Sequence, residues 1–152
     1  MESFQYSCAP SVLLLEGPRI PIDISAISSE IREGGLVGLE IPATPARISG
    51  LIDTGSSFTI VSPEIAQQCK LRATGFNPTV ASMRDIGKYP QYAAWIRFPG
   101  TALQGLDATP VVAIEIKQVN PRRYDCIIGR DILQRWLLTY SGNGAVSIQE
   151  LR

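Results

Sequence analysis

Short apolar runs, separated by residues that form turns, make up most of this chain. Apolar and polar residues alternate from Ile20 to Ile24, which is the pattern of a half-buried β-strand. Other apolar runs are bounded by glycines and prolines, which are spread along the chain rather than pooled. The predicted strands are residues 20–24, 36–41, 47–52, 58–61, 80–83, 92–98, 109–116 and 124–129. Residues 137–149 predict a final hairpin with Asn143-Gly144 at its turn, so we expect one β-rich domain.

Fewer segments carry helix signals. Ser62-Pro63-Glu64 offers a hydroxyl cap, a proline at the first helical position and an acid in the first turn, which predicts a helix to about Cys69. Residues 131–136 predict another short helix, and residues 25–33 fit one that stops at Gly34-Gly35. The pattern as a whole therefore predicts an all-β fold with one or two short helices.

Composition limits the partners of the chain. Its 152 residues include 14 basic and 14 acidic side chains, and no long run of one charge occurs. This balance gives no reason to expect binding to nucleic acid or to an anionic membrane surface. The apolar run 12–15 is too short for a signal peptide or a membrane span, and no basic segment precedes it. We therefore expect a cytoplasmic protein.

The chain contains no histidine, which excludes Ser-His-Asp and Cys-His nucleophilic catalysis and histidine-ligated zinc. Its three cysteines, Cys8, Cys69 and Cys126, are odd in number and have no CxxC spacing, so neither a disulfide framework nor a metal site is expected. We expect Cys69 and Cys126 to be small buried hydrophobic residues. No cofactor is expected, and a hydrolase built from this chain would use carboxylates, lysine or a hydroxyl.

Asp53-Thr54-Gly55-Ser56 is the segment most suited to chemistry. The apolar pair Leu51-Ile52 would anchor a strand in the core and hold Asp53 in place. The Thr54 hydroxyl and backbone N–H would fix the loop, Gly55 would let another backbone approach, and Ser56 would bond the carboxylate or the loop. The same triplet also makes an ordinary turn, so by itself it leaves a structural and a catalytic interpretation open.

A second segment, Ile127-Ile128-Gly129-Arg130, changes that balance. Together with residues 51–56 it resembles the retropepsin-like aspartic proteases, whose signature is an apolar pair before Asp-Thr-Gly and, downstream, two apolar residues and a glycine leading into a short helix. The resemblance extends from about residue 20 to residue 148, although only these two motifs are specific. It implies a pepsin-like or retropepsin-like closed β-barrel-like domain in which Ile127, Ile128 and Gly129 pack behind the catalytic loop.

The resemblance also implies the organisation of the chain. Residues 18–152 would form one protease domain, and residues 1–17 an N-terminal extension. A hairpin over residues 80–98 would be the flap over the substrate cleft. Retroviral enzymes place an acid where this chain has Ser57, so Arg130 needs another partner, either Asp125 or the Ser57 backbone. The residues of the expected flap tip are Met83, Arg84, Asp85, Ile86 and Gly87.

An aspartic protease needs two catalytic carboxylates close enough to share a proton, so that one pKa of the pair rises and the pair titrates as a unit. This chain has no second Asp-Thr-Gly or Asp-Ser-Gly. The prediction is therefore a homodimeric aspartic endopeptidase that cleaves extended peptides with one Asp53 from each chain. The alternative is a non-catalytic retropepsin-fold dimer that binds extended peptides. An unrelated antiparallel β protein with a chance Asp-Thr-Gly turn is the third interpretation.

Overall fold

Strands that follow one another around a ring form the body of the protein. The computed structural model describes residues 3–32, 35–40, 45–81, 85–116 and 124–151. Within these residues six strands close into a barrel because the first and last of them, β11 and β10, also pair with each other. In order around the ring they are β11 (Leu106–Ala113), β6 (Ile60–Val61), β12 (Cys126–Ile128), β5 (Ala46–Ile52), β2 (Arg19–Ala26) and β10 (Gln91–Arg97). The short strand β7 (Arg72–Ala73) pairs with β10.

Alternate residues of the ring strands fill the barrel. On β2, Ile20, Ile22 and Ile24 are at most 1% exposed, as the period of two in the sequence predicts. On the neighbouring β5, Gly50 has no side chain, and a Cβ there would lie 2.4 Å from Cδ1 of Ile22. The absence of a side chain at Gly50 therefore leaves room for the Ile22 side chain inside the barrel, next to the strand end that carries Asp53.

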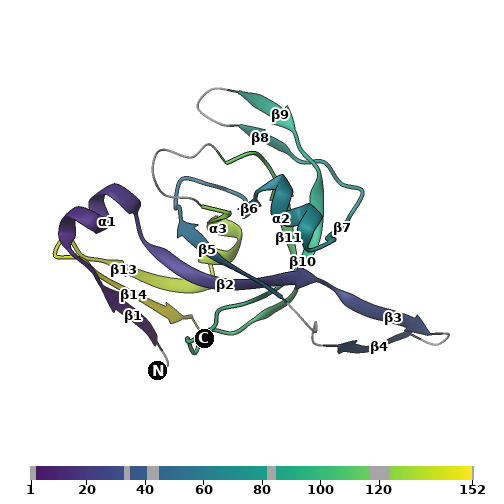
Figure 1. Cartoon of the computed structure of the whole chain (residues 1–152), viewed down its shortest axis with the longest axis horizontal. Helices are drawn as coiled ribbons and strands as arrows, with labels where there is room; N and C mark the ends of the chain where they lie inside the picture. Colours follow the sequence, from purple (N-terminus) through teal and green to yellow (C-terminus); the bar gives the residue numbers. More distant parts are fainter. Residues whose placement is uncertain (1–2, 33–34, 41–44, 82–84, 117–123, 152) are drawn as a thin grey trace.

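A second, smaller sheet lies beside the barrel. It contains β1 (Ser3–Ser7), β14 (Ala145–Glu150) and β13 (Trp136–Tyr140), and its β13–β14 hairpin is the one that the sequence predicts. The helix α1 (Pro10–Glu16) connects β1 to β2 (Figure 1), and its Leu13 is buried in the core. Residues 3–16 thus contact the rest of the protein through β1 and Leu13. The division into an extension 1–17 and a domain 18–152 stays a prediction.

The helix predicted after Ser62 is confirmed. It is α2 (Pro63–Gln68), in which Ser62 is the N-cap and its hydroxyl accepts a hydrogen bond from the Ile65 N–H at 3.3 Å. The helix after Gly129 is α3 (Arg130–Leu133), shorter than the predicted 131–136 because Trp136 already begins β13. With α1, the described residues hold three short helices rather than one or two. None of the described helices is long and apolar enough to cross a membrane.

The helix predicted over residues 25–33 is wrong. Strand β2 continues to Ala26, where it pairs with β10, and residues Ser28–Arg32 form β3, which pairs with β4 (Gly35–Glu40). A Gly-Gly pair is typical of hairpin connections as well as of helix ends. Pairing with β10 and β4 satisfies the backbone here, and this tertiary context decides the outcome over local helix propensity.

The long hairpin predicted from residues 80–83 and 92–98 is also wrong in its pairing. Strand β8 (Thr79–Ala81) pairs with β9 (Ile86–Lys88), and these two strands form a short hairpin of their own. The other predicted strand is β10, which lies in the barrel between β11 and β2. In Figure 1 the β8–β9 hairpin stands away from the barrel at the top of the molecule.

The cysteines behave largely as their sequence context predicts. All three are free thiols. Cys126 on β12 is fully buried, and the loss of solvent raises the pKa of its thiol, which stays protonated at physiological pH. Cys69 is only partly buried. Cys126 is therefore a core residue of the strand behind the candidate site and has no nucleophilic character.

Candidate active site

Asp53 lies at the point where β5 ends. Its own N–H donates to the carbonyl of Ile128 on β12 at 3.0 Å, and the N–H of Ile52 donates to the carbonyl of Pro18 at 2.8 Å. Neighbouring segments thus hold the chain on both sides of the strand end. The buried Ile52 side chain, 5% exposed, anchors the same point in the core. The Asp53 backbone is therefore fixed, while its side chain is only partly buried.

The loop after Asp53 folds back on the carboxylate. Its Oδ1 accepts a hydrogen bond from the Gly55 N–H at 2.8 Å. A Cβ at Gly55 would lie only 3.1 Å from that same oxygen, so glycine allows this close approach. The Ser56 hydroxyl donates to the Phe58 carbonyl at 2.7 Å and so bonds the loop rather than the carboxylate. Thr54 is exposed at the tip of the loop.

Strand β12 lies directly beside β5. The two strands are parallel, with Ile127 opposite Leu51 and Ile128 opposite Ile52, so the two apolar pairs of the sequence motifs are neighbours in the sheet. Ile128 is fully buried. Gly129 follows where β12 ends, and a Cβ there would lie 2.3 Å from the Phe58 carbonyl oxygen. The backbone of the loop after Asp53 and the backbone at Gly129 would therefore leave no space for a side chain between them.

Arg130 connects the two segments on the solvent side. Its N–H donates to the Ser56 carbonyl at 2.9 Å, and its guanidinium Nη2 donates to the Ser57 hydroxyl at 2.6 Å. The sequence predicted Asp125 or the Ser57 backbone as the partner of Arg130, whereas its guanidinium bonds the Ser57 side chain, at the position where the sequence has a hydroxyl in place of an acid. Both contacts hold the outer part of the loop against the start of α3.

A hydrogen-bonded pair that the motifs did not indicate, the buried Thr59 and the partly buried Asp131, completes this support. Thr59 is 0% exposed. Its N–H donates to Oδ2 of Asp131 at 2.8 Å, and its hydroxyl donates to Oδ1 at 2.7 Å. The same hydroxyl accepts from the Gly129 N–H at 3.2 Å. The sequence did carry a signal, because a hydroxyl residue within the apolar run 58–61 must find a buried hydrogen-bond partner.

Replacing Asp131 by alanine tests this pair. We expect Asp131→Ala to lower the free energy of unfolding by about 2–4 kcal/mol, because the Thr59 N–H and hydroxyl lose their acceptor inside the protein. The matched variant Asp131→Asn keeps one carbonyl oxygen, and we expect about half of that loss. Urea unfolding of the three proteins measures both values. Wild-type stability for Asp131→Ala would contradict the role of the pair.

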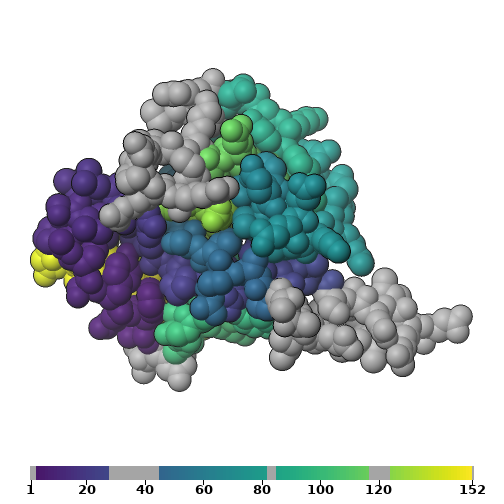
Figure 2. Space-filling model, in the orientation of Figure 1, coloured from purple at the N-terminus to yellow at the C-terminus, as the bar shows by residue number. Residues whose placement is uncertain are grey.

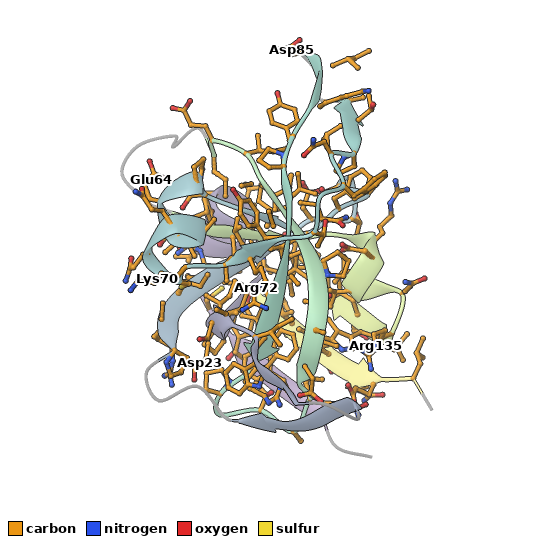
Figure 3. All side chains as sticks on the ribbon, turned by 90° about the vertical axis from the view of Figure 1, so that its right-hand side faces the viewer. Asp23, Glu64, Lys70, Arg72, Asp85 and Arg135 are labelled. Atoms are coloured by element: carbon orange, nitrogen blue, oxygen red, sulfur yellow. The ribbon has the colours of Figure 1, made fainter. Side chains whose placement is uncertain are left out.

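The expected flap tip falls partly outside the described residues. Met83 and Arg84 lie there, while Asp85 is exposed and Ile86 and Gly87 belong to β9. Ile86 is 71% exposed, although it is a large apolar residue. Figure 3 shows Asp85 at the outer end of the hairpin, far from the barrel. The hairpin therefore presents an apolar side chain to solvent near its end.

The chemistry of the site rests on carboxylates and hydroxyls. Among the described residues, no group of three or more Cys, Asp or Glu side chains gathers as metal ligands would. The sequence supplies one Asp-Thr-Gly segment, which contributes the Asp53 carboxylate at this place. The structure therefore brings residues 53–57 together with residues 127–131, which are far apart in the sequence, around a single partly exposed aspartate.

Comparison with known proteins identifies the fold. No protein-family model matches the chain, and no curated protein matches its sequence. A solved structure of the EIAV protease complexed with the inhibitor HBY-793 matches with a TM-score of 0.50 and 18% identity, over 77% of this chain and 85% of that chain. A retropepsin-like aspartic protease from Rickettsia conorii matches with a TM-score of 0.48 and 13% identity, over 97% and 91%. The closed barrel and the match to the viral protease show that the chain has a retropepsin-like fold.

Proposed function

We propose that this protein is a homodimeric aspartic endopeptidase. The observation that carries the proposal is the position of Asp53. Its backbone is fixed between Pro18 and Ile128, one carboxylate oxygen is bonded by the loop, and the carboxylate remains partly exposed. An aspartate that only stabilises a turn needs a fixed backbone and a hydrogen bond from the loop, but it does not need to be exposed. Exposure on a rigid support is what a carboxylate needs if it is to meet water and substrate.

Two Asp53 carboxylates, one from each chain, would perform the reaction. One takes a proton from a water molecule, which attacks the peptide carbonyl, while the other, protonated, donates a proton to the substrate. The attack forms a bond between the water oxygen and the carbonyl carbon, and breakdown releases the amine with a proton from the pair. Two carboxylates that lie close together share one proton, so the pair holds its acid and its base at the same time and requires no covalent intermediate.

The peptide would lie extended between the catalytic loop and the β8–β9 hairpin. The fold places this hairpin outside the barrel, and its exposed Ile86 offers an apolar contact to a substrate side chain. Thr54 is exposed at the loop tip, and its side chain makes no hydrogen bond within the described part of the chain. It is therefore free to brace the loop of the second protomer across the two-fold axis.

A shared site makes activity depend on protein concentration. We expect the rate per protomer to fall on dilution and, well below the dimer dissociation constant, the total rate to follow the square of the concentration. Initial rates of peptide cleavage over a dilution series, compared with sedimentation equilibrium at the same concentrations, measure this. A rate per protomer that stays constant far below the dissociation constant would contradict a site built from two chains.

A further inference from the structure

The outward face of α1 is mostly apolar and carries no charged residue. Leu13 is 2% exposed in the core, whereas Leu14 and Leu15 are 80% and 83% exposed, the highest values among the large hydrophobic residues that the structure describes. Pro10 and Ser11 are exposed one turn earlier and share this face, because residues three or four apart are neighbours on a helix. We call Pro10, Ser11, Leu14 and Leu15 the α1 patch. It carries no charge.

The α1 patch is attached to the strand that ends at Asp53. The helix ends at Glu16, and two residues later the Pro18 carbonyl accepts the Ile52 N–H at 2.8 Å. Leu15 is three residues before Pro18, so their Cα atoms are at most about 11 Å apart. A Cβ on Gly17 would lie 2.7 Å from Cδ1 of Leu51, which shows how closely this connection packs on β5.

A second set of contacts fixes the same end of the helix. The Tyr124 hydroxyl donates to the Glu16 carbonyl, and the Arg19 guanidinium lies over the Tyr124 ring, 4.3 Å from its centre. Tyr124 lies two residues before β12, the strand that pairs with β5 beside Asp53. The α1 patch is therefore held rigidly relative to the catalytic loop, from two sides.

We propose that the α1 patch contacts a second copy of this chain beside the two-fold axis that pairs the two Asp53 residues. This rests on the proposed function, since the half-site at Asp53 needs a second copy at this end of β5. In a two-fold dimer, a surface close to the axis meets the same surface of the partner. Such a surface must avoid charge, because like charges would face each other, and the α1 patch meets this requirement.

The position of α1 in the molecule agrees with a place at the dimer interface. Figure 1 shows α1 and the arrowhead of β5 toward the same end of the molecule, and in Figure 2 the purple N-terminal segment forms that end of the surface. A stable interface buries about 800 Å² per partner, and a helix of seven residues is only about 10 Å long. The α1 patch would therefore be the apolar centre of a larger contact that includes the exposed Thr54.

Sedimentation equilibrium of a charge variant tests this. We expect Leu14→Glu/Leu15→Glu to raise the dimer dissociation constant at least about a hundredfold, because apolar contact is lost and four carboxylates face one another. The matched control is Leu151→Glu, at a leucine that is 58% exposed near the carboxyl end, and we expect less than about a threefold change. Near-UV circular dichroism compares the folds of the three proteins.

Measurements of activity distinguish a role of the α1 patch in dimerisation from a role in catalysis. The α1 patch does not touch substrate in the proposed site, so the double variant should regain wild-type activity per protomer once its concentration exceeds its dissociation constant. If the two glutamates disturb the fold, Leu14→Ala/Leu15→Ala is the second test. Alanine removes apolar area from the α1 patch and favours the helix more than leucine does. We expect the dimer dissociation constant of this variant to rise at least about tenfold.

The outcomes distinguish the two proposals. Double variants that dimerise as tightly as wild type overturn the role of the α1 patch and leave the dimeric protease standing. A wild-type chain that is monomeric at every concentration and still cleaves peptides overturns the proposed function, and the role of the patch with it. A wild-type chain that never dimerises and never cleaves peptides also overturns both the proposed function and the role of the α1 patch.

Discussion

Replacing Asp53 by asparagine is expected to abolish peptide cleavage while the fold and the dimer persist. Asparagine has nearly the same shape, and its carbonyl oxygen still accepts the Gly55 N–H that bonds Oδ1 in the wild type. It cannot take a proton from water or hold one for the substrate. Because positioned acid–base groups contribute about 10²–10⁴-fold each, and both copies of the residue change at once, the rate should fall at least about 10³-fold.

Mass spectrometry of a diverse peptide mixture, incubated with each protein from acid to neutral pH, measures this loss. The matched control is Asp107→Asn, which changes an exposed aspartate at the start of β11 and breaks only its ion pair with Arg97. We expect the control to cleave at the wild-type rate. Cleavage by Asp53→Asn at that rate, in a preparation free of other proteases, would refute the assignment of Asp53.

The same experiment addresses the non-catalytic alternative. A dimer that binds extended peptides but uses no dyad would bind the mixture equally well with aspartate or asparagine at position 53, and neither protein would release products. A protease instead shows a large difference in product release between two proteins that bind alike. Binding measured beside cleavage, for example by retention of labelled peptides, therefore separates the two functions.

The local sequence pattern was enough to predict the strands in which apolar and polar residues alternate or in which apolar residues follow one another. The period of two at Ile20, Ile22 and Ile24 corresponds to β2, and the apolar pairs before Asp53 and Gly129 correspond to the paired strands β5 and β12. Ser62-Pro63-Glu64 marked the start of α2 correctly. In each of these segments the preference of the residues and the tertiary environment agree, which is the condition under which sequence patterns are informative.

The features that the pattern missed depend on contacts between distant residues. Thr59 and Asp131 are 72 residues apart, and nothing near either residue specifies the other. Arg130 bonds the Ser57 hydroxyl, a choice that depends on how two loops approach. Strand β2 extends to Ala26 and Ser28–Arg32 form β3 because β10 and β4 are present to pair with them. Strand pairing over such separations is set by the whole fold rather than by local propensity.

A large loss of stability is expected from a methyl group at Gly129. In Gly129→Ala the new Cβ would lie 2.3 Å from the carbonyl oxygen of Phe58 and 2.4 Å from its carbon. Both are backbone atoms, and the Phe58 carbonyl also accepts the Ser56 hydroxyl, so no flexible side chain can move aside. We expect the free energy of unfolding to fall by about 3 kcal/mol or more, at the upper end of the cost of overpacking.

Activity should fall further than the loss of folded protein explains. Relief of the overlap must separate the Gly129 segment from the catalytic loop, and a shift of about 1 Å at a catalytic group costs about a hundredfold in rate. The matched control is Gly142→Ala in the β13–β14 turn, where a Cβ would meet nothing within 4 Å, and we expect a change within about 0.5 kcal/mol. Urea unfolding and cleavage rates of both variants measure these effects. Equal stability and equal activity of the two alanine variants would show that the contact between Gly129 and Phe58 does not hold Asp53 in place.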